Sequence, residues 1–147
     1  MEKVILLLVL LFGVVCGHPL LKLTRPMAPC SQQACGGEVK DLVVNFDPDP
    51  PKTGQTLKIT ITGHLDKEIT GGEIDVTAKL FGIPVLNTKY NVCDVVSGGC
   101  PFQGAFTGSA TQDITSSAPK REYVIDIKGT DQSGGELLCV EAKCTFE

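Results

Sequence analysis

Hydrophobic and polar residues alternate in short runs along most of the chain. In the run that starts at Gln55, the apolar residues Leu57, Ile59 and Ile61 are separated by lysine and threonine. A period of two places one face of an extended segment in a core and the other in water. The run therefore predicts a half-buried β-strand.

Four further segments show the same alternation, each beside a turn rich in Gly, Pro, Asp or Ser: residues 42–46, 74–80, 123–127 and 138–142. Sixteen glycines and nine prolines interrupt the chain, and no uninterrupted stretch keeps the i, i+3, i+4, i+7 apolar spacing of a helix. Short strands at this spacing predict an all-β protein built as an antiparallel β-sandwich.

The first 17 residues have the pattern of a secretory signal peptide. Lys3 precedes an unbroken apolar run from Val4 to Leu11, and small residues follow before His18. Cleavage after Gly17 leaves residues 18–147, a length that predicts one domain. The formal net charge of −4 provides no basic surface for nucleic acid, so we expect no nucleic-acid partner.

Six cysteines follow the predicted signal peptide, and an even number in a short exported chain predicts disulfides. Cys93 and Cys100 are separated by a short flexible segment and are expected to pair locally. The other four are expected to join the two ends of the chain: Cys30, Cys35, Cys139 and Cys144. Zinc coordination is the competing interpretation, but export, wide separation and the lack of a nearby histidine favour oxidation.

No pattern in the sequence indicates catalysis, a metal site or a cofactor. His64 lies in a segment that resembles a turn after a strand, and no G-x-S-x-G motif is present. Asp47 and Asp49 suggest calcium, but the prolines around them and the missing closing glutamate favour a solvated turn. We therefore expect a protein that is not an enzyme.

Three strings, in order between Asp41 and Phe146, indicate a family: DLVVNFDPDPPKTGQTLKITITGHL, KLFGIPVLNTKYNVCDVVSGGCPF and ELLCVEAKCTF. Together they resemble the ML (MD-2-related lipid-recognition) family, especially its phosphatidylglycerol/phosphatidylinositol transfer proteins. Two features depart from that branch. Cys35 and Cys144 look like an added bridge, and Val140 stands where sterol-carrying relatives often have tryptophan.

The resemblance implies an immunoglobulin-like sandwich of two antiparallel sheets with an apolar cavity between them. It also implies that Cys30 pairs with Cys139 and Cys35 with Cys144, although the swapped pairing stays open because the strand direction at the ends is unknown. The implied function is transfer of phosphatidylglycerol or phosphatidylinositol between membranes, with transient membrane contact. The alternatives are a sterol carrier similar to the lysosomal Niemann-Pick protein and a lipid-sensing recognition module. We expect a monomer, either secreted or in the endosomal or lysosomal lumen.

Strand parity then gives candidate lipid-binding residues, each of which is otherwise an ordinary core residue. Those expected to line the cavity are Leu57, Ile59, Ile61, Ile74, Val76, Ala78, Leu80, Tyr123, Ile125 and Ile127. Those expected at its mouth, beside Gly and Pro, are Phe81, Ile83, Val85, Pro101 and Phe102. Candidate cations for a lipid phosphate are Lys89, Lys120 and Arg121, which are otherwise solvated surface charges.

Overall fold

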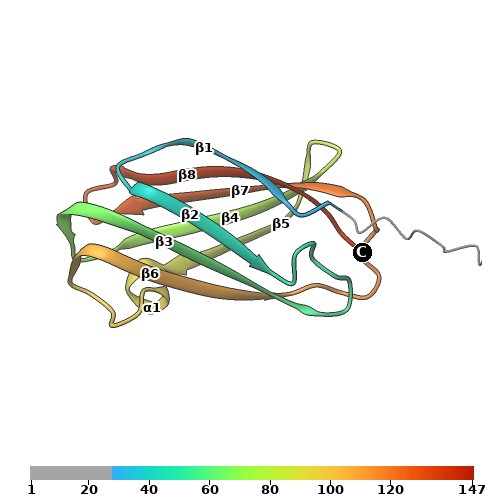
Figure 1. Ribbon diagram of the computed structural model, residues 1–147, viewed down its shortest axis with the longest axis horizontal. Coiled ribbons are helices and arrows are strands. Elements are labelled where there is room, and N and C mark those ends of the chain that lie inside the picture. Colours follow the sequence, from blue (N-terminus) through green and yellow to red (C-terminus); the bar gives the residue numbers. More distant parts are fainter. Residues whose placement is uncertain (1–27) are drawn as a thin grey trace, which may run out of the picture.

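Two antiparallel β-sheets pack face to face in the computed structural model, which describes residues 28–147 (Figure 1). The larger sheet has the strand order β1-β8-β7-β4-β5, and the smaller has the order β2-β3-β6. The expected all-β sandwich is thus confirmed. The predicted signal peptide, residues 1–17, lies outside the described residues.

The elements follow one another along the chain as β1 (Ser31–Gly37), β2 (Lys40–Asp47), β3 (Thr56–Ile69), β4 (Gly72–Leu80), β5 (Ile83–Asn91), α1 (Val92–Val95), β6 (Phe102–Asp113), β7 (Glu122–Asp131) and β8 (Glu136–Thr145). The five segments with apolar alternation fall in β2, β3, β4, β7 and β8. Strands β1, β5 and β6 were not predicted. On β6 the inward positions include Gly108 and Ala110, and such small residues give no apolar signal.

The segment around His64 is a strand rather than the expected turn. β3 continues to Ile69 because β6 pairs with it along almost its whole length, with His64 opposite Ala105 and Ile69 opposite Phe102. The His64 side chain is exposed on this strand.

All six cysteines of the described chain are paired in disulfides, which excludes the zinc interpretation. The local bridge Cys93–Cys100 is present as expected. The terminal bridges are Cys30–Cys144 and Cys35–Cys139, so the pairing implied by the family resemblance is wrong and the swapped one is found. The reason is the antiparallel register of β1 on β8, which sets Ser31 opposite Lys143 and Gly36 opposite Cys139. Cys30 therefore lies beside Cys144, and Cys35 lies beside Cys139.

The two ends of the sandwich are built differently. One end holds α1, and there a small group of buried residues packs densely between the sheets: Leu65, Ile69, Val92, Val96 and Leu137. The other end holds the C-terminus, the β4–β5 hairpin and the loop from Ile114 to Arg121 (Figure 1). Asn91 caps α1, and its side-chain oxygen accepts a hydrogen bond from the Cys93 N–H at 2.8 Å.

Peptide mapping tests the register of β1 on β8. Digestion of the oxidised protein without reduction, with elastase to cleave after Ala34 between the two cysteines, is expected to yield linked peptides containing Cys30 with Cys144 and Cys35 with Cys139. The two bridges are nested, so the bridge that remains still holds the chain ends together, and removing one is expected to cost no more than ~3 kcal/mol of unfolding free energy in the chain-entropy model. Recovery of a Cys30–Cys139 peptide would contradict this register.

Candidate functional site

A pocket of about 460 Å³ lies between the sheets at the C-terminal end of the sandwich. Its walls come from β3 and β6 of the smaller sheet and from β4, β5 and β7 of the larger one. The lining is largely apolar and includes aliphatic side chains from both sheets. This volume lies within the roughly 300–1,000 Å³ typical of small-molecule sites.

Strand register arranges the lining in layers. Leu80 pairs with Tyr123 at the mouth, and Ala78 pairs with Ile125 one layer further in. Leu57 and then Ile59 face these layers from β3. Because successive inward residues on a strand are two positions apart, each layer lies roughly 7 Å deeper than the one before.

A second, much smaller pocket of about 30 Å³ adjoins the inner end of the first. Both pockets are lined by Ile59, Val76, Tyr90 and Ala110. The ten residues that the sequence placed on the cavity face all line one pocket or the other: Leu57, Ile59, Val76, Ala78, Leu80, Tyr123 and Ile125 line the large pocket, and Ile59, Ile61, Ile74, Val76 and Ile127 line the small one.

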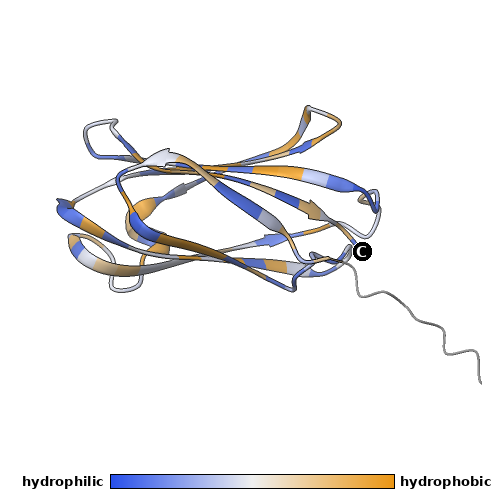
Figure 2. Cartoon of the chain, turned by 45° about the horizontal axis from the view of Figure 1, so that its top comes forward, coloured by the Kyte–Doolittle hydropathy of each residue, from blue (hydrophilic) through white to orange (hydrophobic). Residues whose placement is uncertain are grey.

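The five residues expected at the mouth do not come together. Val85 lines the large pocket. Phe81 and Ile83 lie at the same end, on the tip of the β4–β5 hairpin, and are 82% and 66% exposed. Figure 2 shows this hairpin at the C-terminal end of the sandwich, with hydrophobic segments in orange. Pro101 and Phe102 lie at the α1 end, where Phe102 pairs with Ile69. That is twelve residues along β3 from Leu57, roughly 40 Å, so the structure does not place them at the mouth.

Polar groups gather on one lip of the pocket, along the end of β6 and the loop that follows. They are Thr111, Gln112, Asp113, Thr115 and Ser117. The Asp113 Oδ1 accepts a hydrogen bond from the Thr56 hydroxyl at 2.6 Å, and the Thr115 and Ser117 hydroxyls are 3.2 Å apart. This lip offers hydroxyl, amide and carboxylate groups to a polar ligand head.

The candidate cations lie outside the pocket. Within residues 28–147, no lysine or arginine lines either pocket. The Lys89 ammonium is 2.6 Å from the Glu73 carboxylate, and this hydrogen bond raises the pKa of Lys89. Lys89 thus belongs to a surface ion pair. Lys120 and Arg121 are exposed and come directly after the lining residue Pro119.

The sequence did not identify several residues that shape the pocket: Leu86, Tyr90, Ala110, Ile114, Pro119 and Phe146. Tyr123 stacks on Phe146 with ring centroids 4.2 Å apart, and its hydroxyl donates to the Pro119 carbonyl at 3.0 Å. The Phe146 N–H donates to the Arg121 carbonyl, and the Glu147 N–H donates to the Pro51 carbonyl. The last residues of the chain therefore tie both sheets together beside the mouth.

The side of the pocket between strands β5 and β6 is held by long hydrogen bonds. These strands are the edges of different sheets. The Thr88 hydroxyl is 3.3 Å from Gln112 Oε1, and the Tyr90 hydroxyl is 3.4 Å from the Thr111 carbonyl oxygen. Burial raises the pKa of Tyr90, so the phenol keeps its proton and acts as the donor.

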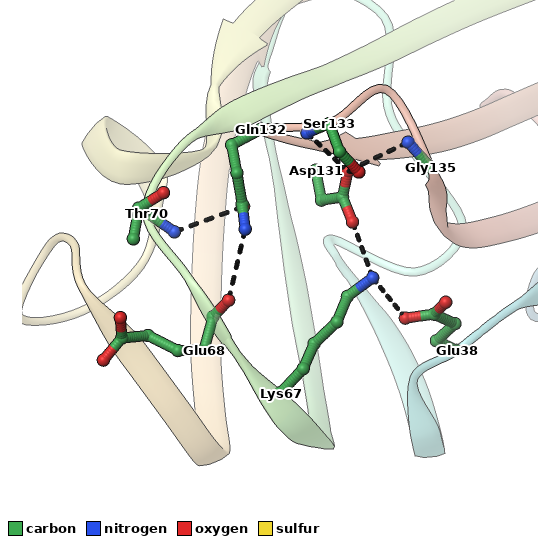
Figure 3. Close-up of polar contacts among 8 residues, drawn as sticks. All are labelled: Glu38, Lys67, Glu68, Thr70, Asp131, Gln132, Ser133 and Gly135. Carbon is green, nitrogen blue, oxygen red and sulfur yellow. Dashed lines mark hydrogen bonds and ion pairs between the residues drawn. The ribbon is translucent and has the colours of Figure 1, made fainter.

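At the α1 end, an ion pair between the buried Asp131 and the half-buried Lys67 joins the two sheets (Figure 3). The Lys67 ammonium of β3 lies 2.6 Å from the Asp131 carboxylate of β7 and 2.6 Å from Glu38. Asp131 Oδ1 also accepts bonds from the Ser133 N–H, the Ser133 hydroxyl and the Gly135 N–H. The Lys67 ammonium and these donors hold the pKa of Asp131 far below its usual range.

The same end carries a second link between the sheets. The Gln132 side chain accepts a hydrogen bond from the Thr70 N–H and donates one to the Glu68 carbonyl, each at 3.3 Å (Figure 3). The α1 end is thus packed and bridged by polar bonds, whereas the C-terminal end contains the pocket.

In the described part of the chain, no three acidic, histidine or cysteine side chains are grouped as metal ligands. No helix there has the length and apolar character to span a membrane.

Comparison with known proteins decides the family. The sequence model of the ML domain matches residues 25–146. The chain belongs to the ML-domain family. A relative from Dictyostelium discoideum, named "Putative phosphatidylglycerol/phosphatidylinositol transfer protein 3", is 33% identical over 116 residues, which cover 78% of this chain and 76% of that protein.

Solved structures show the same fold as this ML domain. A Niemann-Pick type C2 protein from the Japanese carpenter ant aligns with a TM-score of 0.65 and 15% identity, covering 80% of this chain and 99% of that chain. Chicken MD-1, solved as a complex with lipid IVa, aligns with a TM-score of 0.57 and 17% identity, covering 79% of this chain and 88% of that chain. Both likenesses confirm the immunoglobulin-like sandwich.

The α1 end of the ML domain is expected to resist acid. A carboxyl group with a depressed folded-state pKa adds stability above its unfolded pKa of about 3.9, and that stability is lost as the pH falls through the folded-state pKa. We therefore expect Asp131→Asn to lower the thermal midpoint by the same several degrees at pH 7 and pH 5. The difference from wild type should narrow only below about pH 4. A difference that already disappears at pH 5 would show that Asp131 is not held ionised by Lys67.

Proposed function

We propose that this protein binds a phospholipid in the large pocket and carries it between membranes in an extracellular or endolysosomal compartment. The observation that carries the proposal is the apolar space of about 460 Å³ between the sheets. The names of its relatives support a phosphatidylglycerol or phosphatidylinositol cargo. The three disulfides support an oxidising compartment.

The energetics favour an acyl chain as the buried part of the ligand. Each methylene that leaves water gains ~0.8 kcal/mol, so an aliphatic pocket competes with the bilayer interior for the chain. The polar lip from Thr111 to Ser117 then faces the head group with hydrogen-bonding groups. Lys120 and Arg121, next to that lip, supply positive charge for a phosphate. Transfer of this kind needs no covalent step.

The β4–β5 hairpin is the part that we expect to touch the membrane. Phe81 and Gly82 form its two-residue tip, with φ of 52° and 78°, as in the type I′ turns that suit hairpins. Phenylalanine rarely adopts a positive φ, and here its side chain is exposed close to the exposed Ile83. Because the tip lies at the end that contains the pocket, its insertion would bring the mouth to the lipid.

A sterol is the second candidate cargo. The specific observation in its favour is that, within residues 28–147, neither pocket is lined by a cation, so the interior suits an uncharged ligand.

A lipid-sensing recognition module with the same ligand is a third reading. Transfer assays with fluorescent phosphatidylglycerol, phosphatidylinositol and a sterol analogue between vesicles separate the three readings. A protein that accelerates transfer of none of them is not a carrier.

Filling the pocket tests whether lipid occupies it. Val76 lines both pockets, and a phenylalanine there displaces about two methylenes of a bound chain, which is ~1.6 kcal/mol or about tenfold in affinity. We expect Val76→Phe to weaken lipid binding by about this factor with little change in thermal midpoint. Binding is measured by displacement of a fluorescent lipid.

Val124→Phe is the matched control, because Val124 is the half-buried outward neighbour of Ile125 on β7. It should leave lipid affinity unchanged. If Val76 is instead part of a close-packed core, its substitution costs ~1–3 kcal/mol of unfolding free energy and changes affinity no more than the control does. That result would contradict the proposed site.

The tip of the β4–β5 hairpin is expected to control the rate of lipid transfer between vesicles rather than the equilibrium affinity for lipid. Replacing Phe81 and Ile83 together by serine removes apolar side chains that lie outside the pocket lining. Vesicle-to-vesicle transfer should slow severalfold, while equilibrium binding of a soluble short-chain lipid stays the same. Val43→Ser removes another exposed hydrophobic residue, on β2, and should affect neither. Equal transfer rates for the double variant and wild type would rule out this membrane contact.

A further inference from the structure

The large and small pockets adjoin at four side chains that they share. Ile59, Val76, Tyr90 and Ala110 line both spaces. Ile59 pairs with Ala110 across β3 and β6, and Val76 lies on the opposite sheet, on β4. Tyr90, near the end of β5, closes the remaining side. We call these four residues the collar. They mark where the large pocket ends.

Tyr90 is the member of the collar that can move. Isoleucine and valine are restricted at χ1 by their branched Cβ, and alanine has no rotamers. The Tyr90 ring is half-buried at the edge of its sheet. One hydrogen bond of 3.4 Å, from its hydroxyl to the Thr111 carbonyl, holds it across to β6. A bond of this length is weak.

Beyond the collar the sandwich is apolar and retains a small space of about 30 Å³. The small pocket is walled by Ile61, Ile74, Phe106, Gly108, Ile127 and Leu138. A Cβ added at Gly108 would lie at ordinary contact distance, 3.6 Å or more, from Val95 and Val96, so one methyl group fits there. Further along, the sheets close on the packed residues around Leu65 and Ile69. An apolar chain that passed the collar would therefore meet matching surface and then a fixed end.

We propose that Tyr90 closes the inner end of the lipid pocket and sets the length of the apolar chain that the protein accepts. The inference rests on the proposed lipid-binding function. With Tyr90 bonded to Thr111, the chain ends at the collar. With the ring turned aside, the large pocket gains the roughly 30 Å³ of the small one together with the space that the ring leaves, so the chain reaches deeper. Tyr90 thus selects among lipids with the same head group.

The test is a series of saturated phosphatidylglycerols with chains from short to long, bound at equilibrium to the oxidised protein. Wild type should gain affinity with chain length up to a plateau. Tyr90→Ala should move the plateau to longer chains, with about a fourfold gain for each further methylene that becomes buried. Tyr90→Phe keeps the ring but loses the bond to Thr111, so it should shift the plateau in the same direction by less.

Two further variants make the result specific to the collar. Adding Gly108→Ala to Tyr90→Ala refills part of the inner space and should reverse part of the shift. Asn87→Ala changes the outward face of the same strand, where Asn87 bonds to Asp75 and Thr77, and should leave the plateau unchanged. If Tyr90→Ala does not fold, the position of the plateau is compared among wild type, the Tyr90→Phe variant and the Gly108→Ala single variant.

The outcomes separate this inference from the proposed function. If wild type binds no phospholipid of any length, the proposed function fails. If wild type binds but the plateau is the same in both Tyr90 variants, lipid binding stands and the role of Tyr90 is overturned. A plateau that also moves in Asn87→Ala would assign the effect to β5 as a whole and overturn the role of Tyr90 as well.

Discussion

The two sheets of this ML domain pack fully against each other at the α1 end, whereas at the other end they leave a space beside their packed residues, and the pocket follows from that asymmetry. At the α1 end, Lys67 and Asp131 form an ion pair between the sheets, and Leu65, Ile69 and Leu137 fill the space around them. At the other end, aliphatic side chains from both sheets face a space of about 460 Å³. A dense interior is the rule for proteins because a void forfeits dispersion contacts. A pocket of this size therefore needs a physical explanation.

Residue size supplies the cause. The strand β6 places Gly108 and Ala110 on its inward face, and β4 contributes Ala78. Ala110 lies beside Ile59 in the smaller sheet, and Ala78 lies on the larger sheet. Together these side chains do not span the distance between the sheets. The five-stranded sheet also presents more inward surface than the three-stranded sheet covers. The missing contacts are offset elsewhere. Two disulfides fasten β1 to β8, and the last residues of the chain bridge to Pro51 and Arg121.

The sequence predicted the strands that carry this core but not the ones that shape the void. Alternating Val, Ile and Leu residues are a strong signal, so β3, β4 and β7 could be placed, and the parity of Ile59 or Val76 followed from the period of two. Inward positions of β6 alternate Phe102 and Phe106 with the glycines, Ala110 and Gln112, so no continuous run of aliphatic residues marked this strand. The mouth was partly misplaced because Phe102 and Val85 both follow Gly and Pro, and local sequence does not reveal at which end of a strand a residue lies. The terminal disulfides depended on the direction of β1 against β8, which is a tertiary property.

Where the end of a bound chain lies is the most direct test of the account. A phosphatidylglycerol with a photoreactive diazirine near the terminal methyl of one chain can be bound, irradiated and mapped by peptide mass spectrometry. If a chain enters the pocket, crosslinks should concentrate in peptides containing Ile59, Val76 and Tyr90 at its inner end. Crosslinks confined to the hairpin tip at Phe81 and Ile83, or spread over the outer faces of the sheets, would show that no chain enters the sandwich and would contradict the account.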